Sequence, residues 1–122
     1  MPYFSYRFTA TACMILFSLL AICFIIYPPL FVYIFGLDSS SSVYVVLRRS
    51  GVVFMGLAVI MGLTRGFSVD ATQKAIIKSF VLAFFALAAL GITEWFKGTV
   101  GSGVWLAIIV EILFGLMLIR TR

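Results

Sequence analysis

Four long apolar segments make up most of this chain and constrain its fold more than any other feature. They run at about 8–27, 43–64, 75–96 and 100–119. Each has close to the ~20 residues that an α-helix needs to cross a hydrocarbon core of ~30 Å. The strict alternation of a membrane-spanning strand is absent. The sequence therefore predicts an all-α integral membrane four-helix bundle, with residues 1–122 as a single transmembrane domain.

The composition leads to the same prediction. Hydrophobic residues make up 64% of the chain and charged residues 11%, against roughly 45–50% and about 25% in soluble domains. Between the first two apolar segments, Pro28-Pro29 is expected to end the first helix, because proline lacks the amide proton that a helix needs. Leu30–Leu37 is too short to span and is expected to form a short interfacial helix. The serine-rich segment Asp38–Ser42 is expected to be a loop.

The basic residues predict the orientation of the helices. With four crossings, both termini and the loop between the second and third segments share one side of the membrane. That side carries Arg7, Arg65, Lys74, Lys78, Arg120 and Arg122, and the other side carries Arg48, Arg49 and Lys97. Because cytoplasmic loops are enriched in Lys and Arg, both termini are predicted to be cytoplasmic.

Several kinds of chemistry find no support in the sequence. The chain has no histidine, which removes imidazole ligation of metals and histidine-based catalysis. Its two cysteines, Cys13 and Cys23, point apart on one helix and do not form a metal motif. No nucleophile with a base, metal cluster or phosphate-cradling loop is present. We therefore expect no enzyme activity, no catalytic residue, no metal and no cofactor, and the scattered basic residues predict no nucleic-acid partner.

One carboxylate interrupts the most apolar segment. Gly103, Ala107, Glu111 and Gly115 recur every four residues and therefore share one face of the last helix. Small residues let transmembrane helices approach closely, so this face is predicted to pack inside the bundle and Glu111 to point inward. On the second helix, Gly56 and Gly62 are predicted to pack in the same way.

The basic residues that open the second helix are the expected counter-charges for Glu111. Either Arg48 or Arg49 can face the bundle, and Arg49 is favoured because it shares a face with Gly56. Glu94, near the outer end of the third helix, is expected to complete this Glu–Arg network. A charged residue at the centre of a transmembrane helix costs about 3 kcal/mol on insertion scales, so such a residue usually has a structural or functional role. Three interpretations stay open: a structural ion pair, a ligand or proton site in a pocket, or contact with a partner subunit.

Two stretches resemble a known group of proteins. "YPPLFVYIFGL" after the first segment and "LRRSGVVFMGLAVI" at the start of the second are similar to the pattern of small bacterial four-helix membrane proteins of the DoxX-like group. The resemblance covers most of the chain. It implies a multi-pass protein of the bacterial inner membrane, with an arginine near the outer end of helix two that matches Arg48 or Arg49. It implies no established reaction.

A second resemblance concerns the last segment alone. "WLAIIVEILFGLMLIR" is similar to the glutamate-bearing helix of the small multidrug-resistance transporters. That family also has four helices and a similar length. Its glutamate lies on the first helix, however, whereas Glu111 lies on the last, and the arginines at positions 48 and 49 also depart from its pattern.

Two functional hypotheses follow from the sequence. The first is a non-enzymatic accessory or assembly protein, which contacts a membrane-protein partner or a second copy of itself through its helices. The second is a carrier or binder of a small amphiphilic or ionic ligand, with or without proton coupling, in a pocket around Glu111, Arg48 and Arg49. In both hypotheses the helices are also expected to contact the lipid bilayer.

Overall fold

The described part of the chain is mostly α-helical. The computed structural model describes residues 4–38, 40–66 and 71–121, and within these residues it has no strand. The all-α prediction is confirmed. The five helices are α1 (Tyr6–Ile26), α2 (Pro29–Phe35), α3 (Ser41–Thr64), α4 (Ala71–Phe96) and α5 (Val104–Ile119).

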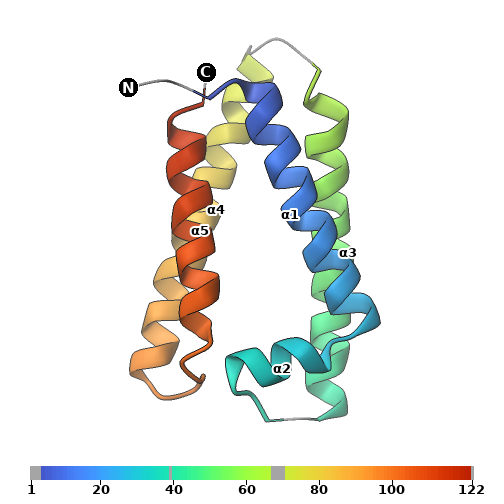
Figure 1. Ribbon diagram of the computed structural model, residues 1–122, viewed down its shortest axis with the longest axis vertical. Coiled ribbons are helices and arrows are strands. Elements are labelled where there is room, and N and C mark those ends of the chain that lie inside the picture. The colour runs from blue at the N-terminus through green and yellow to red at the C-terminus, as the bar shows by residue number, and fades with distance from the viewer. Residues whose placement is uncertain (1–3, 39, 67–70, 122) are drawn as a thin grey trace.

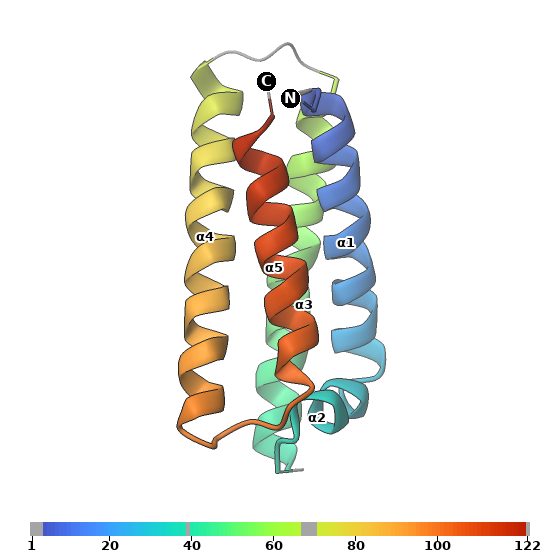
Figure 2. The same cartoon turned by 60° about the vertical axis from the view of Figure 1, so that its left-hand side comes forward.

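The four longer helices form two antiparallel hairpins. The first hairpin pairs α1 with α3, and the second pairs α4 with α5. The contact between α1 and α5 is much smaller. The hairpins meet at the end that carries both chain termini, which we call the terminal end, and diverge toward the opposite end (Figure 1). The short helix α2 lies across that opposite end (Figure 2). The arrangement is thus two splayed hairpins, a more open form than the predicted bundle.

The length and composition of these helices suit a membrane. Helices α1, α3 and α4 are each long and apolar enough to cross one. Helix α5 is also apolar but has 16 residues. It begins at Val104 rather than at the predicted position 100, because residues 97–103 form the connection between α4 and α5.

Serine side chains set the starts of two helices. The Ser5 hydroxyl accepts a hydrogen bond from the Phe8 amide at 3.2 Å and caps α1. The Ser40 hydroxyl accepts one from the Val43 amide at 3.2 Å and caps α3. Helix α3 therefore begins at Ser41, inside the segment predicted to be a loop, which is corrected here. Ser39 of that segment lies outside the described residues.

The double proline separates α1 from α2 as predicted. Pro29 occupies the first turn of α2, where its missing amide proton is not needed. The helix ends at Gly36, whose φ of +64° is a left-handed conformation that favours glycine. The Phe31 and Val32 side chains of α2 are buried, and the Phe31 ring packs edge-on against Phe24 of α1.

The end of α2 is attached to the start of α5. The Gly101 amide donates a hydrogen bond to the Phe35 carbonyl at 2.6 Å. The backbones of Gly36 and Gly101 lie so close that a Cβ on Gly36 would come within 2.9 Å of Gly101, and a Cβ on Gly101 would come within 3.3 Å of Gly36. Gly103, which precedes α5, lies against the backbone of Ile34. At the divergent end, the hairpins are therefore joined through α2.

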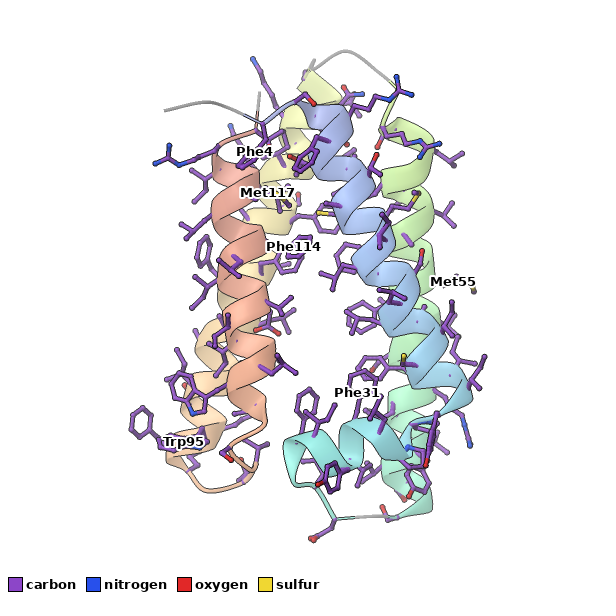
Figure 3. The ribbon with its side chains drawn as sticks, in the orientation of Figure 1. Phe4, Phe31, Met55, Trp95, Phe114 and Met117 are labelled. Carbon is purple, nitrogen blue, oxygen red and sulfur yellow. The ribbon has the colours of Figure 1, made fainter. Side chains whose placement is uncertain are left out.

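A cluster of aromatic and apolar side chains fills the space where the hairpins meet. The Phe17 ring of α1 lies 5.9 Å from Phe54 of α3, and 5.7 and 5.8 Å from Phe80 and Phe84 of α4, measured between ring centroids. All four longer helices contribute to this cluster, whose other buried members are Tyr6, Ala10, Cys13, Ala58, Met61 and Leu118. Phe31 and Phe114 lie between the hairpins, whereas Met55 and Trp95 lie on the outside (Figure 3).

Hydroxyl groups connect the helices at the terminal end. The Thr9 and Thr121 hydroxyls are 2.7 Å apart and join α1 to the end of α5. The Tyr6 and Thr64 hydroxyls are 2.9 Å apart and join α1 to α3. The Phe4 amide donates to the Arg120 carbonyl at 2.9 Å. These bonds hold both described chain ends against the hairpins.

Glycines at the helix contacts behave differently from one another. Within the first hairpin, a Cβ on Gly62 would come within 2.9 Å of the Met14 sulfur. In the second, a Cβ on Gly115 would come equally close to the Phe85 ring. Gly56, predicted to pack in the same way, has nothing within 4 Å of that position. The Gly56 prediction is wrong within this chain, because the buried residues of α3 are Gly51, Ala58 and Met61, with Phe54 half-buried between them.

Replacing Gly103 with alanine is expected to destabilise the protein by about 1–3 kcal/mol, because the new methyl group would overlap the Ile34 carbonyl. Thermal unfolding in a mild detergent would measure this as a lower melting temperature. Gly56→Ala is the matched control, and its melting temperature should stay the same or rise slightly. An unchanged melting temperature for Gly103→Ala would contradict the contact between α2 and α5.

Candidate functional site

Glu111 occupies a central position on the inward face of α5. The buried residues of this helix are Val104, Ile108, Gly115 and Leu118, which are four, seven and three residues apart. Glu111 stands at the missing middle position of this stripe, three residues after Ile108 and four before Gly115. The prediction that it points inward agrees with this placement. The stripe itself passes through Val104 and Ile108, whereas Ala107 is only half-buried beside it.

The opposing surface of α4 offers no polar side chain at this depth. Gly91 of α4 contacts Ile108, and Phe85 contacts Gly115. Glu111 lies between these two contacts and is therefore level with about Ala88, which is 3% exposed. All the residues of α4 from 85 to 91 are apolar or glycine. The short side chains there leave room for the carboxylate but supply no hydrogen-bond donor.

The carboxylate of Glu111 has no partner. Its Oε2 atom is buried and accepts no hydrogen bond. No ion pair occurs among the residues that the structure describes. A buried polar atom without a partner costs free energy that a hydrogen bond would recover. Glu111 is thus the one described residue whose polar side-chain atom is fully buried and unsatisfied.

The predicted Glu–Arg network is absent from the described residues, and this expectation is corrected. Arg48 and Arg49 are both exposed on α3, which belongs to the other hairpin. Gly51, just after them, contacts α1 at Ala21 and Phe24. Counting from the bond between Thr9 and Thr121 at 1.5 Å per residue, the arginines lie roughly 10 Å further toward the divergent end than Glu111. They are too far along the helix, and on the wrong hairpin, to meet the carboxylate.

Glu94 has a different role from the one predicted. It lies near the end of α4, half-buried, and its side chain forms no ion pair. Its backbone carbonyl accepts hydrogen bonds from the amide and the hydroxyl of Thr99, at 3.1 and 3.0 Å. These bonds close the turn after α4, in which Gly98 takes a φ of +75°. Glu94 is positioned by its backbone in this turn.

Aromatic side chains gather at the same end of the second hairpin. The ring of Trp95 lies 5.3 Å from Phe96 and 5.5 Å from Trp105. These three aromatic side chains thus form one cluster in the structure. Trp and Tyr favour the membrane–water interface, where an apolar ring can keep a polar atom in contact with water.

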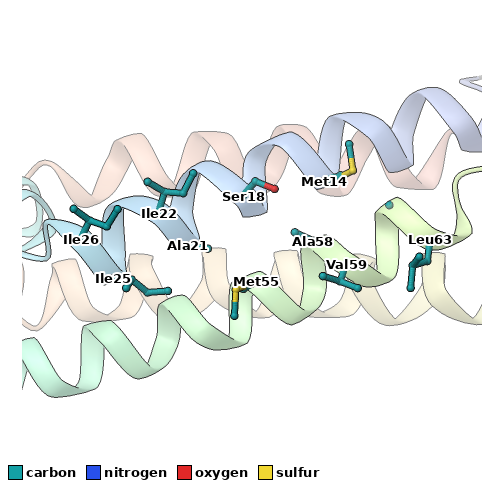
Figure 4. A pocket seen from close by; sticks show the side chains of 11 residues that line it. Met14, Ser18, Ala21, Ile22, Ile25, Ile26, Met55, Ala58, Val59 and Leu63 are labelled. Atoms are coloured by element: carbon teal, nitrogen blue, oxygen red, sulfur yellow. The ribbon is translucent and has the colours of Figure 1, made fainter.

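Shallow grooves run along the helix pairs, and the sequence analysis did not identify them. One lies between α1 and α3, with a volume of about 530 Å³, and is lined almost wholly by apolar side chains (Figure 4). Another, of about 480 Å³, lies between α3 and α4. A third, of about 920 Å³, lies between α4 and α5 and includes Lys74 and Lys78. Only the pairing of helices in space creates these grooves, so no local sequence signal marks them.

The described residues contain no group of three or more Cys, Asp and Glu side chains close enough to hold a metal ion. Both cysteines are unpaired. The polar chemistry of the candidate site therefore rests on the single carboxylate of Glu111, which lies between Ile108 and Gly115 on α5 and level with about Ala88 of α4. Comparison of the chain with protein-family models, curated proteins and solved structures gives no match.

Replacing Glu111 with leucine is expected to leave the melting temperature unchanged or to raise it. Leucine is one atom shorter than glutamate but apolar, and it removes an unsatisfied polar atom from an apolar stripe. The measurement is thermal unfolding in a mild detergent. Ile108→Ala, one turn away and 1% exposed in the native protein, is the control that should lose about 2–5 kcal/mol through a cavity. A large loss for Glu111→Leu would show that the carboxylate is paired after all.

Proposed function

We propose that this chain is a multi-pass protein of the bacterial inner membrane with cytoplasmic termini. The support is the length and apolar character of α1, α3 and α4, together with the large apolar side chains exposed along α1, α3, α4 and α5. The described basic residues lie toward the two ends of the hairpins, and more of them lie toward the terminal end. In this orientation α2 and the Trp95–Trp105 cluster face outward.

Within the membrane, the protein acts without catalysis as a binder or carrier of a small amphiphilic ligand. The observation that carries this proposal is the unpartnered, buried Oε2 atom of Glu111. An ionisable residue inside a membrane is costly and is usually found where it serves a function. A structural ion pair would have explained Glu111, but the described residues contain none. The remaining explanation is a partner that is not part of this chain.

The chemistry of the site restricts the ligand. A carboxyl group surrounded by apolar side chains is satisfied by a hydrogen-bond donor or a cationic group. The surroundings, Ala88, Ile108 and Gly115, favour an apolar remainder of the ligand. We therefore expect a molecule with one amine, ammonium or hydroxyl group on an apolar body. Arg48 and Arg49, which are exposed on the other hairpin and lie further toward the divergent end, take no part in this contact.

Glu111→Gln is expected to lower ligand binding at least tenfold while leaving the protein folded. Glutamine keeps the size of the side chain but cannot pair with a cation. Dodecylamine serves as the probe, because it combines an ammonium group with a single apolar chain. Binding to the purified protein in mild detergent is measured by native mass spectrometry.

Glu94→Gln is the matched control for this experiment and should bind the probe like the wild type. Dodecanoate, which carries a carboxylate on a similar chain, should bind much more weakly than dodecylamine. Equal binding of dodecylamine to both glutamine variants and the wild type would overturn the proposal. So would equal binding of the two amphiphiles to the wild-type protein.

A second function, as an accessory protein that docks against another membrane helix, is favoured by one observation. Gly56 lies on an exposed part of α3 with open space above it, and such positions allow close helix approach in membranes. If this face is used, Gly56→Leu should remove a complex of defined stoichiometry that the wild type forms in mild detergent. Val59→Leu, one turn away, should keep it. A wild-type protein that purifies alone as a monomer contradicts this second function.

A further inference from the structure

The groove between α4 and α5 at the terminal end differs in character from the others. Its volume is about 920 Å³, and its lining includes Lys74, Lys78, Val81 and Phe85 of α4. Ile119 and Thr121 line it from the other side. Two basic residues, Lys74 and Lys78, therefore line one end of an otherwise mainly apolar groove.

The groove changes from charged to apolar along its length. Lys74, Lys78, Val81 and Phe85 follow steps of four, three and four, so they form one line along α4. The two lysines are exposed and lie nearest the terminal end, whereas Val81 and Phe85 are half-buried and lie deeper. From Lys74 to Phe85 the line covers roughly 16 Å. That is about half of the ~30 Å hydrocarbon core, or the depth of one leaflet.

The other grooves lack this charge. The groove between α1 and α3 is lined by apolar residues, glycine and Ser18, without a charged residue (Figure 4). The groove between α3 and α4 contains Thr72 and Ser79 but no charged residue either. Basic side chains at the mouth of an apolar groove are complementary to a molecule with an anionic head and an apolar tail. No carboxylate is among the described residues that line the groove with the lysines.

We propose that this groove binds an anionic phospholipid of the cytoplasmic leaflet. The phosphate lies near Lys74 and Lys78, and one acyl chain follows Val81 and Phe85 between the two helices. In this arrangement the lysines bind the headgroup of one lipid that the groove holds in a fixed place. This differs from a general attraction of exposed lysines to the membrane surface. The site is separate from Glu111, and it holds whether or not Glu111 binds a ligand.

The test measures binding of phosphatidylglycerol and phosphatidylcholine to the delipidated protein by native mass spectrometry in mild detergent. The wild type should bind phosphatidylglycerol in preference to phosphatidylcholine. Lys74→Gln with Lys78→Gln should weaken phosphatidylglycerol binding about 25-fold, at about fivefold for each basic residue near a membrane surface. Arg48→Gln with Arg49→Gln makes the same change in net charge at the opposite end and should leave binding unchanged.

A second pair of variants tests the groove without changing its charge. Val81→Trp should fill the space for the acyl chain and weaken phosphatidylglycerol binding severalfold. Val59→Trp, in the uncharged groove between α1 and α3, is the matched control and should have no effect. Melting temperatures establish that each variant is folded, and Glu111→Gln should bind phosphatidylglycerol like the wild type.

Two results would overturn the proposal. Equal losses in the lysine and arginine double variants would show that net charge alone attracts the lipid. Equal binding of phosphatidylglycerol and phosphatidylcholine by the wild type would show that the basic residues do not select an anionic headgroup.

Discussion

The packing of Phe17 against Phe54, Phe80 and Phe84 is the contact on which the rest of the structure depends. These rings, 5.7 to 5.9 Å apart, belong to three helices and to both hairpins. In a membrane, the lipid tails are as apolar as the helix surfaces, so helices gain no hydrophobic free energy by associating. Close packing of side chains has to hold such helices together. Each hairpin packs along its whole length, but the hairpins pack on each other mainly around this cluster. The Phe17 cluster therefore determines where the two hairpins meet. Beyond the cluster, toward the opposite end, the hairpins diverge.

The divergence of the hairpins explains why the Glu111 carboxylate has no ion-pair partner. The carboxylate lies on the α4–α5 hairpin, and the arginines expected to pair with it lie on the α1–α3 hairpin, further toward the divergent end. At that end the hairpins are joined through α2, by the Gly101–Phe35 hydrogen bond and the contact of Gly103 with Ile34. The carboxylate is thus left among Ala88, Ile108 and Gly115 without a partner. This is why we propose a binding role for it, where pairing would have indicated a structural one.

The second hairpin carries both proposed sites, and they differ in chemistry. Glu111 supplies a single acceptor in an apolar surrounding, near the middle of α5. Lys74 and Lys78 supply positive charge at the terminal end, beside a groove that continues along Val81 and Phe85. The first site suits a donor or cation, and the second suits an anionic headgroup. A lipid in the second site would also cover the α4–α5 contact near the terminal end, where the Thr9–Thr121 bond joins the end of α5 to α1.

The sequence by itself determined the helices, the break at Pro28-Pro29 and the inward direction of Glu111, because hydrophobic length, proline chemistry and helical spacing act within a few turns of one segment. One helix boundary still differed from the prediction: α3 begins directly after its cap, Ser40, inside the segment expected to be a loop. Only the tertiary structure decided that the hairpins diverge, that Gly56 faces open space, that Arg48 and Arg49 do not reach Glu111, and that two lysines border a groove. Each of these depends on the depth and rotation of one helix relative to another, and a single helix sequence does not contain that information.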